Sequence, residues 1–192
     1  MNGVSDTLFN PNGSLTRAQL VTILHRLVGE PKAEKAANYT DVAADQWYTE
    51  AVAWAAENEI VTGYPDGTFK PMAKISREQI ATILYRFVGS PKVEDDALAA
   101  FPDKASVSSY AVDAMNWAVT NGFINGIASN GVTNLAPKGT ATRAQIAAII
   151  MRFMVMVENN MNNGTDLVDG YQAFHFRNKE RECCGSNRLS LA

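Results

Sequence analysis

Leu15-Thr16-Arg17-Ala18-Gln19-Leu20 is the most informative segment for predicting the fold, because the chain contains two further copies of it. The second copy is Ile75-Ser76-Arg77-Glu78-Gln79-Ile80, and the third is Ala141-Thr142-Arg143-Ala144-Gln145-Ile146. In each copy a hydroxyl residue is followed three positions later by Gln, which is the pattern of a capping box at the start of a helix. Internal similarity of this kind indicates a protein built from repeats.

The residues that follow each copy predict an amphipathic helix. Apolar side chains recur at i, i+3, i+4 and i+7, a spacing that places them on one helix face. These positions are Leu20, Ile23, Leu24 and Leu27; Ile80, Ile83, Leu84 and Phe87; and Ile146, Ile149, Ile150 and Phe153. Gly29-Glu30-Pro31 and Gly89-Ser90-Pro91 predict the ends of the first two helices, because Gly permits a left-handed residue and Pro cannot continue a helix.

A tryptophan-containing block precedes the second and third copies only. It reads Ala51-Val52-Ala53-Trp54-Ala55 in one and Ala114-Met115-Asn116-Trp117-Ala118 in the other, and it predicts an additional helix with the tryptophan in the core. The turn-rich segment 63–69 joins the two helices of its repeat. We therefore expect an all-α fold of helix-loop-helix repeats, with the first repeat truncated.

The repeat pattern also predicts the domain boundaries. Residues 1–36 form the second half of repeat 1, residues 37–91 form repeat 2, and residues 92–157 form repeat 3. Residues 158–192 have no repeat pattern and stay unassigned. This tail is a flexible end, the start of another domain, or a segment that fills the vacant place in repeat 1, and the sequence does not choose among them.

Composition and charge exclude several classes of protein. The net charge of -3 argues against nucleic acid as a main partner, because phosphate binding needs an excess of Lys and Arg. No apolar run is long enough to span a membrane. The only cysteines, Cys183 and Cys184, are adjacent, so neither a disulfide framework nor a spaced metal site is predicted. Residues 1–20 lack the pattern of a signal peptide, so an exported module would take its signal from a longer precursor.

The sequence contains no motif that predicts an enzyme. A nucleophile elbow, a Cys/His pair and a phosphate-binding glycine loop are all missing from it. Pro65-Asp66-Gly67 lacks the ligand spacing of a calcium-binding EF-hand loop. We therefore expect no catalytic activity, no cofactor and no metal.

The arginines at the first helical position are the main candidates for ligand binding. Arg17, Arg77 and Arg143 each place a cation at the positive end of a helix dipole, which costs about 0.3–1 kcal/mol at an exposed site. An anionic ligand would offset that cost, because helix N-termini and guanidinium groups both bind carboxylate and phosphate. The alternative is an internal ion pair with the repeated Asp41 or Asp103, and both can hold if the aspartate orients the arginine.

A second set of arginines and one tryptophan complete the candidates. Arg26, Arg86 and Arg152 come nine residues after the first set, on the opposite side of each helix, so we expect them in solvent or packed along their stems. Trp47 does not repeat, and it stands at a loop-to-helix junction. It is therefore a better candidate for contact with a sugar ring than the two repeated tryptophans.

Taken in order, these motifs resemble the S-layer homology repeat. The resemblance is carried by 39–42, by Trp47-Tyr48, by 63–71 and by the arginine helix, and it covers roughly residues 3–155. It implies a pseudo-threefold helical bundle that holds an extracellular protein to the secondary cell-wall polysaccharide linked to peptidoglycan. That polymer is commonly anionic through pyruvyl ketals, and it binds in grooves between repeats.

The resemblance also implies a set of ligand-binding residues. They are Arg17, Arg77, Arg143, Asp41, Asp103, Trp47, Gly63, Tyr64, Asp66 and Gly67. Gln19, Gln79 and Gln145 stand where the family usually has Glu. The third copy departs further, with Ser109 in place of the Trp and 125–134 in place of the glycine loop.

Two alternatives stay open beside glycan binding. The repeats can form a structural or protein-interaction module whose arginines make only internal ion pairs, with self-association through the incomplete first repeat. The chain can also belong to an envelope enzyme whose catalytic part lies outside these residues. Binding to purified cell walls separates the glycan-binding anchor from the structural module.

Overall fold

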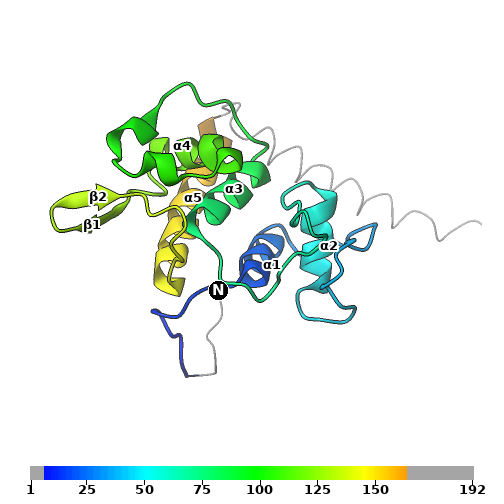
Figure 1. Cartoon of the computed structure of the whole chain (residues 1–192). Helices are drawn as coiled ribbons and strands as arrows, with labels where there is room; N and C mark the ends of the chain where they lie inside the picture. Colours follow the sequence, from blue (N-terminus) through cyan, green and yellow to red (C-terminus); the bar gives the residue numbers. More distant parts are fainter. Residues whose placement is uncertain (1–6, 164–192) are drawn as a thin grey trace, which may run out of the picture.

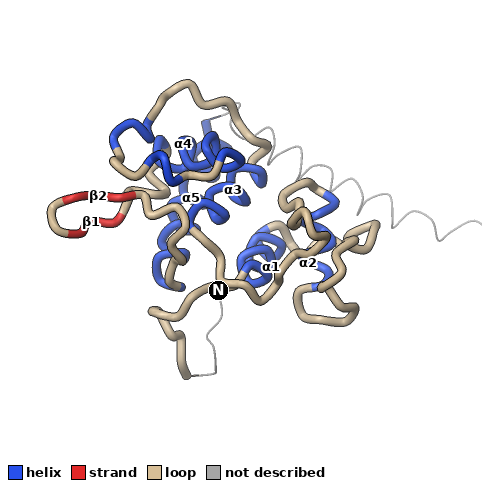
Figure 2. Tube along the Cα trace, viewed as in Figure 1, coloured by secondary structure: helices blue, strands red, loops and turns tan. Residues whose placement is uncertain are grey.

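The computed structural model describes residues 7–163, and this part of the chain is mostly helical (Figures 1 and 2). Its α-helices are α1 (Arg17–Leu27), α2 (Thr49–Glu57), α3 (Arg77–Phe87), α4 (Val112–Thr120) and α5 (Arg143–Asn163). Three short 3₁₀ helices precede α4, namely η1 (Ala97–Ala100), η2 (Lys104–Ser106) and η3 (Ser109–Ala111). None of the described helices is long and apolar enough to cross a membrane. Most of the unassigned tail, residues 164–192, lies outside the described residues.

The arginine helices begin with the predicted capping boxes. Thr16 Oγ1 accepts the N–H of Gln19, and the Gln19 side chain accepts the N–H of Thr16. The same reciprocal pair forms at the starts of α3 and α5. The predicted ends of α1 and α3 are also confirmed, because Gly29 and Gly89 have φ of 84° and 87°. α5 has Val155 at the equivalent position and continues to Asn163.

The first two N–H groups of α1, α3 and α5 bond to the loop of another repeat. In α1, the Arg17 N–H donates to the Ala73 carbonyl and the Ala18 N–H to the Pro71 carbonyl, both at 3.0 Å. In α3, the Arg77 N–H donates to Gly139 at 2.9 Å and the Glu78 N–H to Pro137 at 3.0 Å. In α5, the Arg143 N–H donates to Gly13 at 2.8 Å and the Ala144 N–H to Pro11 at 3.0 Å. Short β-bridges join the same segments. Repeat 1 therefore contacts repeat 2, repeat 2 contacts repeat 3, and repeat 3 contacts repeat 1.

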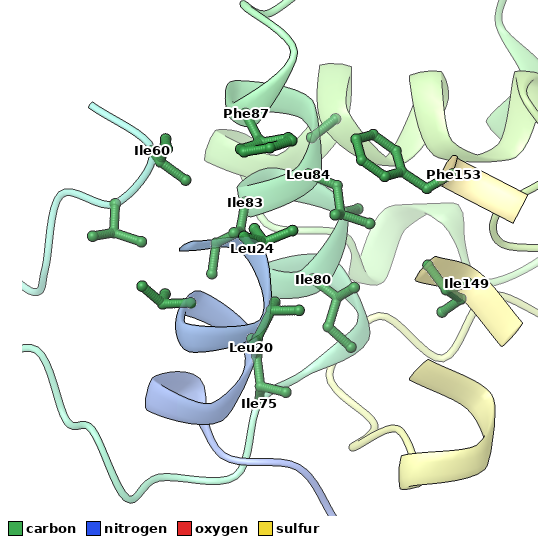
Figure 3. Packing of buried hydrophobic residues seen from close by; sticks show 14 of the residues in the cluster. Leu20, Leu24, Ile60, Ile75, Ile80, Ile83, Leu84, Phe87, Ile149 and Phe153 are labelled. Carbon is green, nitrogen blue, oxygen red and sulfur yellow. The ribbon is translucent and has the colours of Figure 1, made fainter. Parts of the chain in front are cut away.

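The core lies between the arginine helices, as the apolar spacing predicts. Figure 3 shows Leu20 and Leu24 of α1 and Phe153 of α5 pointing into the cluster around α3. Leu84 and Phe87 of α3 are buried in the middle of it. Burial of each such side chain contributes roughly 1.5–3 kcal/mol, so this shared core is a large source of stability.

The tryptophan helices pack against the arginine helices and bury their tryptophans. α2 packs on α1 and α4 packs on α3 (Figure 1). Trp54 lies 5.1 Å from the ring of His25, and Trp117 lies 5.6 Å from the ring of Tyr85. Both tryptophans are at most 2% exposed. The prediction that they belong to the core is confirmed.

A β-hairpin departs from the expected all-α fold. Strands β1 (Ile127–Ser129) and β2 (Val132–Asn134) pair antiparallel, as the red segments in Figure 2 show. The two residues between them, Asn130 and Gly131, have φ of 50° and 77°. Positive φ at both positions gives the tight turn that Asn-Gly favours, because its twist matches that of paired strands. The hairpin occupies the place where repeat 2 has its glycine loop.

The capping boxes give a direct test of this fold. Replacing Ser76 with Ala removes the acceptor for the Gln79 N–H at the start of α3. We expect the free energy of unfolding, measured by urea denaturation, to fall by about 1 kcal/mol. Lys92→Ala, at an exposed ion pair with Glu94, is the control and should change it by less than about 0.5 kcal/mol. Equal effects of the two substitutions would contradict the capping role.

Candidate functional site

Arg17 is a buried cation whose guanidinium is only partly used by the protein. Its Nε donates to the Phe69 carbonyl at 2.8 Å, and its Cζ lies 4.9 Å and 4.7 Å from the ring centroids of Tyr64 and Phe69. The residue is only 6% exposed. Burial lowers the pKa of Arg17, while Tyr64, Tyr110 and other nearby groups oppose the shift. A guanidinium still stays charged at neutral pH. Within residues 7–163, its Nη groups make no hydrogen bond.

The same bond recurs at the other two arginines of this set. Arg77 Nε donates to the Leu135 carbonyl at 2.8 Å, and Arg143 Nε donates to the Phe9 carbonyl at 3.0 Å. Each arginine therefore contacts the loop that also receives the first N–H groups of its helix. Phe9 adds a ring centroid 5.0 Å from the Arg143 guanidinium. The three arginines are buried at equivalent contacts between repeats.

The aspartates hold the residues that the arginines contact. Asp41 accepts the N–H groups of Phe69 and Lys70, both at 2.7 Å, and Asp103 accepts those of Leu135 and Ala136, both at 2.8 Å. Within the described residues no ion pair joins Arg17 to Asp41 or Arg77 to Asp103, so the alternative of an internal ion pair is not seen here. Instead, each aspartate accepts the N–H of a loop residue, and the arginine donates to the carbonyl of that same residue. This residue is Phe69 for Asp41 and Arg17, and Leu135 for Asp103 and Arg77.

The N–H groups at the helix starts are not available to an anion. The expectation that an anion bound there explains the arginines is therefore wrong in that detail. The first two N–H groups of α1 bond to Ala73 and Pro71, and the third bonds to its own capping hydroxyl. The surrounding carbonyls place partial negative charge at the helix start, which favours a cation there. Any anion must therefore approach the outer, Nη side of the arginine.

Arg17 lines a groove formed by residues of all three repeats, here called groove 1. It has a volume of about 230 Å³. Its lining is Arg17, Ile60, Val61, Thr62, Gly63, Tyr64, Pro65, Gln79, Thr82, Ile83, Arg86 and Tyr110. The 60–65 segment and α3 form most of the wall, and Tyr110 comes from repeat 3. Groove 1 therefore combines cations with tyrosine rings and polar side chains.

Arg86 lies in groove 1, contrary to the expectation for the second arginine set. Its Nη1 donates to Thr62 Oγ1 at 3.2 Å. The helical spacing correctly separates Arg77 from Arg86 on α3, but groove 1 lies between α3 and the start of α1. Arg86 therefore shares a groove with Arg17 of the neighbouring repeat. The corresponding Arg26 is exposed and pairs with Glu30 at 3.2 Å, as expected.

A second groove has the same plan with different walls, and we call it groove 2. It measures about 200 Å³ and is lined by Arg77, Phe123, Ile124, Asn125, Gly126, Gln145, Ala148, Ile149 and Arg152. Arg77 and Arg152 take the places of Arg17 and Arg86. Leu135 replaces Phe69 beside the arginine, and no tyrosine lines this groove. Groove 2 therefore keeps the cations and lacks the tyrosine walls, with Phe123 as its aromatic residue.

The other predicted site residues fall into two groups. Gly63 and Tyr64 line groove 1 with Arg17. Gly63 has φ of 69°, and a Cβ there would overlap the ring of Tyr39, so only glycine fits. Asp66, Gly67 and Trp47 line neither groove. Asp66 pairs with Lys70 at 3.2 Å, and Trp47 is 55% exposed at the start of α2.

Glu78 is a site residue that no sequence motif indicated. It is only 3% exposed, and its carboxylate accepts hydrogen bonds from Tyr110 Oη at 3.0 Å, Lys138 Nζ at 2.7 Å and the Ser108 N–H at 3.1 Å. It thereby fixes Tyr110 in the wall of groove 1. Burial and the bond to Glu78 raise the pKa of Tyr110 to about 12. The one available signal was that the other two copies have Ala at this position.

The Glu78 cluster predicts a pH-dependent stability. Burial raises the pKa of Glu78, but the hydrogen bonds from Lys138, Ser108 and Tyr110 outweigh it and hold the pKa below its ordinary value of 4.5. A lowered pKa in the folded state contributes stability above the unfolded-state pKa, and this is lost as the pH falls through the folded-state value. We expect Glu78→Gln to lower the urea midpoint at neutral pH and to approach wild type at acidic pH, as the pH falls through the folded-state pKa of Glu78.

Glu94→Gln is the matched control for that experiment, because Glu94 makes an exposed ion pair with Lys92. It should leave the urea midpoint unchanged at both pH values. A loss in Glu78→Gln that is equally large at neutral and acidic pH would show that the charge of Glu78 is not the cause.

Comparisons with known proteins agree with the repeat pattern. A family model described as the S-layer homology domain matches residues 1–21, 38–81 and 100–147. The chain is 34% identical over 159 residues, 82% of its length, to the surface-layer 125 kDa protein of Lysinibacillus sphaericus. It is 32% identical over 78% of its length to the amylopullulanase of Thermoanaerobacterium thermosulfurigenes. The cellulosome-anchoring protein of Acetivibrio thermocellus is 29% identical over 91% of the chain. The chain spans 13%, 8% and 40% of these relatives' own lengths.

Proposed function

Because the chain belongs to the S-layer homology domain family, we propose that it anchors a surface protein non-covalently to the bacterial cell wall by binding an anionic secondary polysaccharide. Its place is the cell surface, where its surface-layer relatives act. The chain matches only a small part of the amylopullulanase, so the activity in that name belongs to the whole protein. The proposed module is not itself an enzyme.

The observation that carries the proposal is the buried guanidinium of Arg17. A desolvated charge whose Nη donors make no bond to the described residues is costly unless a ligand supplies acceptors. A carboxylate fits this need because it accepts two parallel N–H bonds from one guanidinium. A pyruvyl ketal supplies such a carboxylate on a sugar. Hydrogen bonds to charged groups are each worth about 1.5–3 kcal/mol.

The walls of groove 1 favour a sugar over a small inorganic anion. Tyr64 and Tyr110 offer ring surface for the apolar face of a pyranose, while Gln79 and Thr62 offer hydrogen-bonding groups for its hydroxyls. Arg86 adds a second cation in the same groove. A groove volume of about 230 Å³ admits a sugar residue with its substituent. We therefore assign groove 1 as the main binding site.

The remaining predicted residues take supporting roles in this proposal. Asp41 and Asp103 position the loop carbonyls that hold Arg17 and Arg77. Groove 2 binds the polymer more weakly, because no tyrosine lines it. Arg143 occupies the third equivalent place.

Outside the two grooves, the exposed Trp47, with Asp66 and Gly67, contacts neighbouring sugars of the polymer rather than the charged one. These three residues line neither groove, and Trp47 is open to a sugar at the start of α2.

The same contacts support the proposal that the repeats have a pseudo-threefold arrangement. Each arginine helix donates its first N–H groups to the loop of the next repeat, and the third donates to the first. This closed ring of contacts among the three repeats supports a helical bundle whose grooves lie between repeats. An alternative is a structural module that self-associates through the incomplete first repeat and binds no glycan.

Cell-wall binding by arginine variants tests the proposal. We expect the full chain to co-sediment with purified wall sacculi, and to lose that binding when the secondary polymer is stripped with acid. Arg17→Ala should weaken the apparent affinity by about tenfold or more, because it removes a charge-assisted contact. Arg26→Ala is the matched control, since Arg26 pairs with the exposed Glu30 in the described part of the chain and lines neither groove. Arg77→Ala should weaken binding less than Arg17→Ala.

Two outcomes would contradict the proposal. One is the absence of co-sedimentation by a folded wild-type chain, which would favour the self-associating structural module. The other is an equal loss of binding in Arg17→Ala and Arg26→Ala, which would show that surface charge alone is responsible. Circular dichroism of each variant establishes that it is folded.

The role of Trp47 is tested separately. Trp47→Ala should leave the free energy of unfolding within about 0.5 kcal/mol of wild type, because the side chain is exposed. We expect its binding to long polymer to weaken and its binding to a single charged sugar to stay the same. A loss of affinity for the single sugar would place Trp47 in groove 1 itself.

A further inference from the structure

On the arginine helices of repeats 1 and 2, a second stripe beside the core face is also covered, and it shares Leu24 and Leu84 with that face. On α1 this stripe includes Val21, Leu24, His25 and Val28, and all four are buried. On α3 the equivalent residues are Ala81, Leu84, Tyr85 and Val88, and only Tyr85 is partly open. In both cases the cover is a tryptophan helix, α2 on α1 and α4 on α3.

The same stripe is uncovered on α5. Its residues, Ala147, Ile150, Met151 and Met154, form what we call the α5 face. Met151 is 63% exposed, whereas its counterpart His25 is 5% exposed. The other three are half-buried, although their counterparts on α1 and α3 are all buried. Within residues 7–163, no tryptophan helix packs on α5 as α2 and α4 do on their partners.

We propose that the α5 face is the docking surface for a tryptophan-bearing helix of the α2 and α4 type, supplied by a further repeat of the same family. The two internal interfaces define what this helix must present. In each, a tryptophan lies against the residue equivalent to Met151, at 5.1 Å from His25 and 5.6 Å from Tyr85. Methionine suits that contact, because its sulfur packs well against aromatic rings.

A second copy of this chain is a poor occupant of the α5 face. The tryptophan helices of such a copy already have their tryptophans buried in their own core. Donating α2 or α4 to a neighbour would expose Trp54 or Trp117 and the stripe beneath it. A helix with the same pattern and no partner of its own has no such cost.

The docking helix would also complete groove 2, and this consequence rests on the proposed function. Tyr110 lies just before α4, and it forms a wall of groove 1 while α4 covers α3. A helix that covers α5 in the same way brings the equivalent residue to groove 2, beside Arg77 and Arg152. The tyrosine wall that groove 2 lacks is therefore supplied by the docking helix.

The test is an extended variant that carries such a helix at the spacing found in repeat 2. Leu8-Phe9-Asn10-Pro11 aligns with Thr68-Phe69-Lys70-Pro71, so Gly3 aligns with Gly63. A copy of residues 37–62 placed directly before Gly3 reproduces the connection between α2 and α3. We expect slower hydrogen exchange at the amides of α5 and a rise in Tm of more than about 4 °C.

Met151→Lys is the matched control. In the unextended chain the side chain is exposed, so this substitution should change Tm by less than about 1 °C. In the extended variant it should abolish both the added protection of α5 and the rise in Tm, because a charge would be buried under the grafted tryptophan.

Two results would overturn the proposal. The first is an extended variant whose α5 amides exchange as fast as in the unextended chain. The second is an unextended chain that sedimentation equilibrium shows to be a dimer, with Met151→Lys making it monomeric, because the face would then belong to a second copy. These measurements use no glycan, so their outcome is separate from that of the proposed function.

Discussion

The structure depends on one repeated interaction, the bonding of each arginine helix start to the loop of another repeat. Two backbone N–H groups donate to two loop carbonyls, and the arginine Nε donates to a third carbonyl nearby. Buried backbone groups need partners, and the N–H groups of a helix start have none within their own helix. The loops supply those partners across the repeats, so the helices cannot separate without losing these hydrogen bonds.

This interaction explains why an arginine stands where helix stability alone favours an acid. Loop carbonyls surround the start of α1, and the Phe69 carbonyl accepts from Arg17. Asp41 holds the N–H of Phe69 in turn. The arginine is thereby fixed at its Nε with its Nη groups directed to groove 1. A contact that assembles the repeats therefore also prepares a binding group between them, and the fold and the proposed site are inseparable.

The sequence predicted the features that depend on local spacing. The capping boxes, the apolar stripes and the burial of Trp54 and Trp117 follow from residues within one or two helical turns of each other. The meeting of Arg86 with Arg17 and the role of Glu78 depend on neighbouring repeats, so a pattern within one helix could not reveal them. The hairpin had a local signal, because Asn130-Gly131 favours a two-residue turn between paired strands.

The central claim is that the Nη groups of Arg17 bind the anionic group of a wall polysaccharide. The most direct measurement is an NMR titration of the arginine side-chain resonances of the full chain with a purified pyruvylated wall fragment. We expect saturable shifts of the Arg17 guanidinium signals, with smaller ones at Arg86, and no shift at the exposed Arg26. Shifts that are equal at Arg17 and Arg26, or that vanish at about 0.15 M salt, would show general surface charge instead and contradict it.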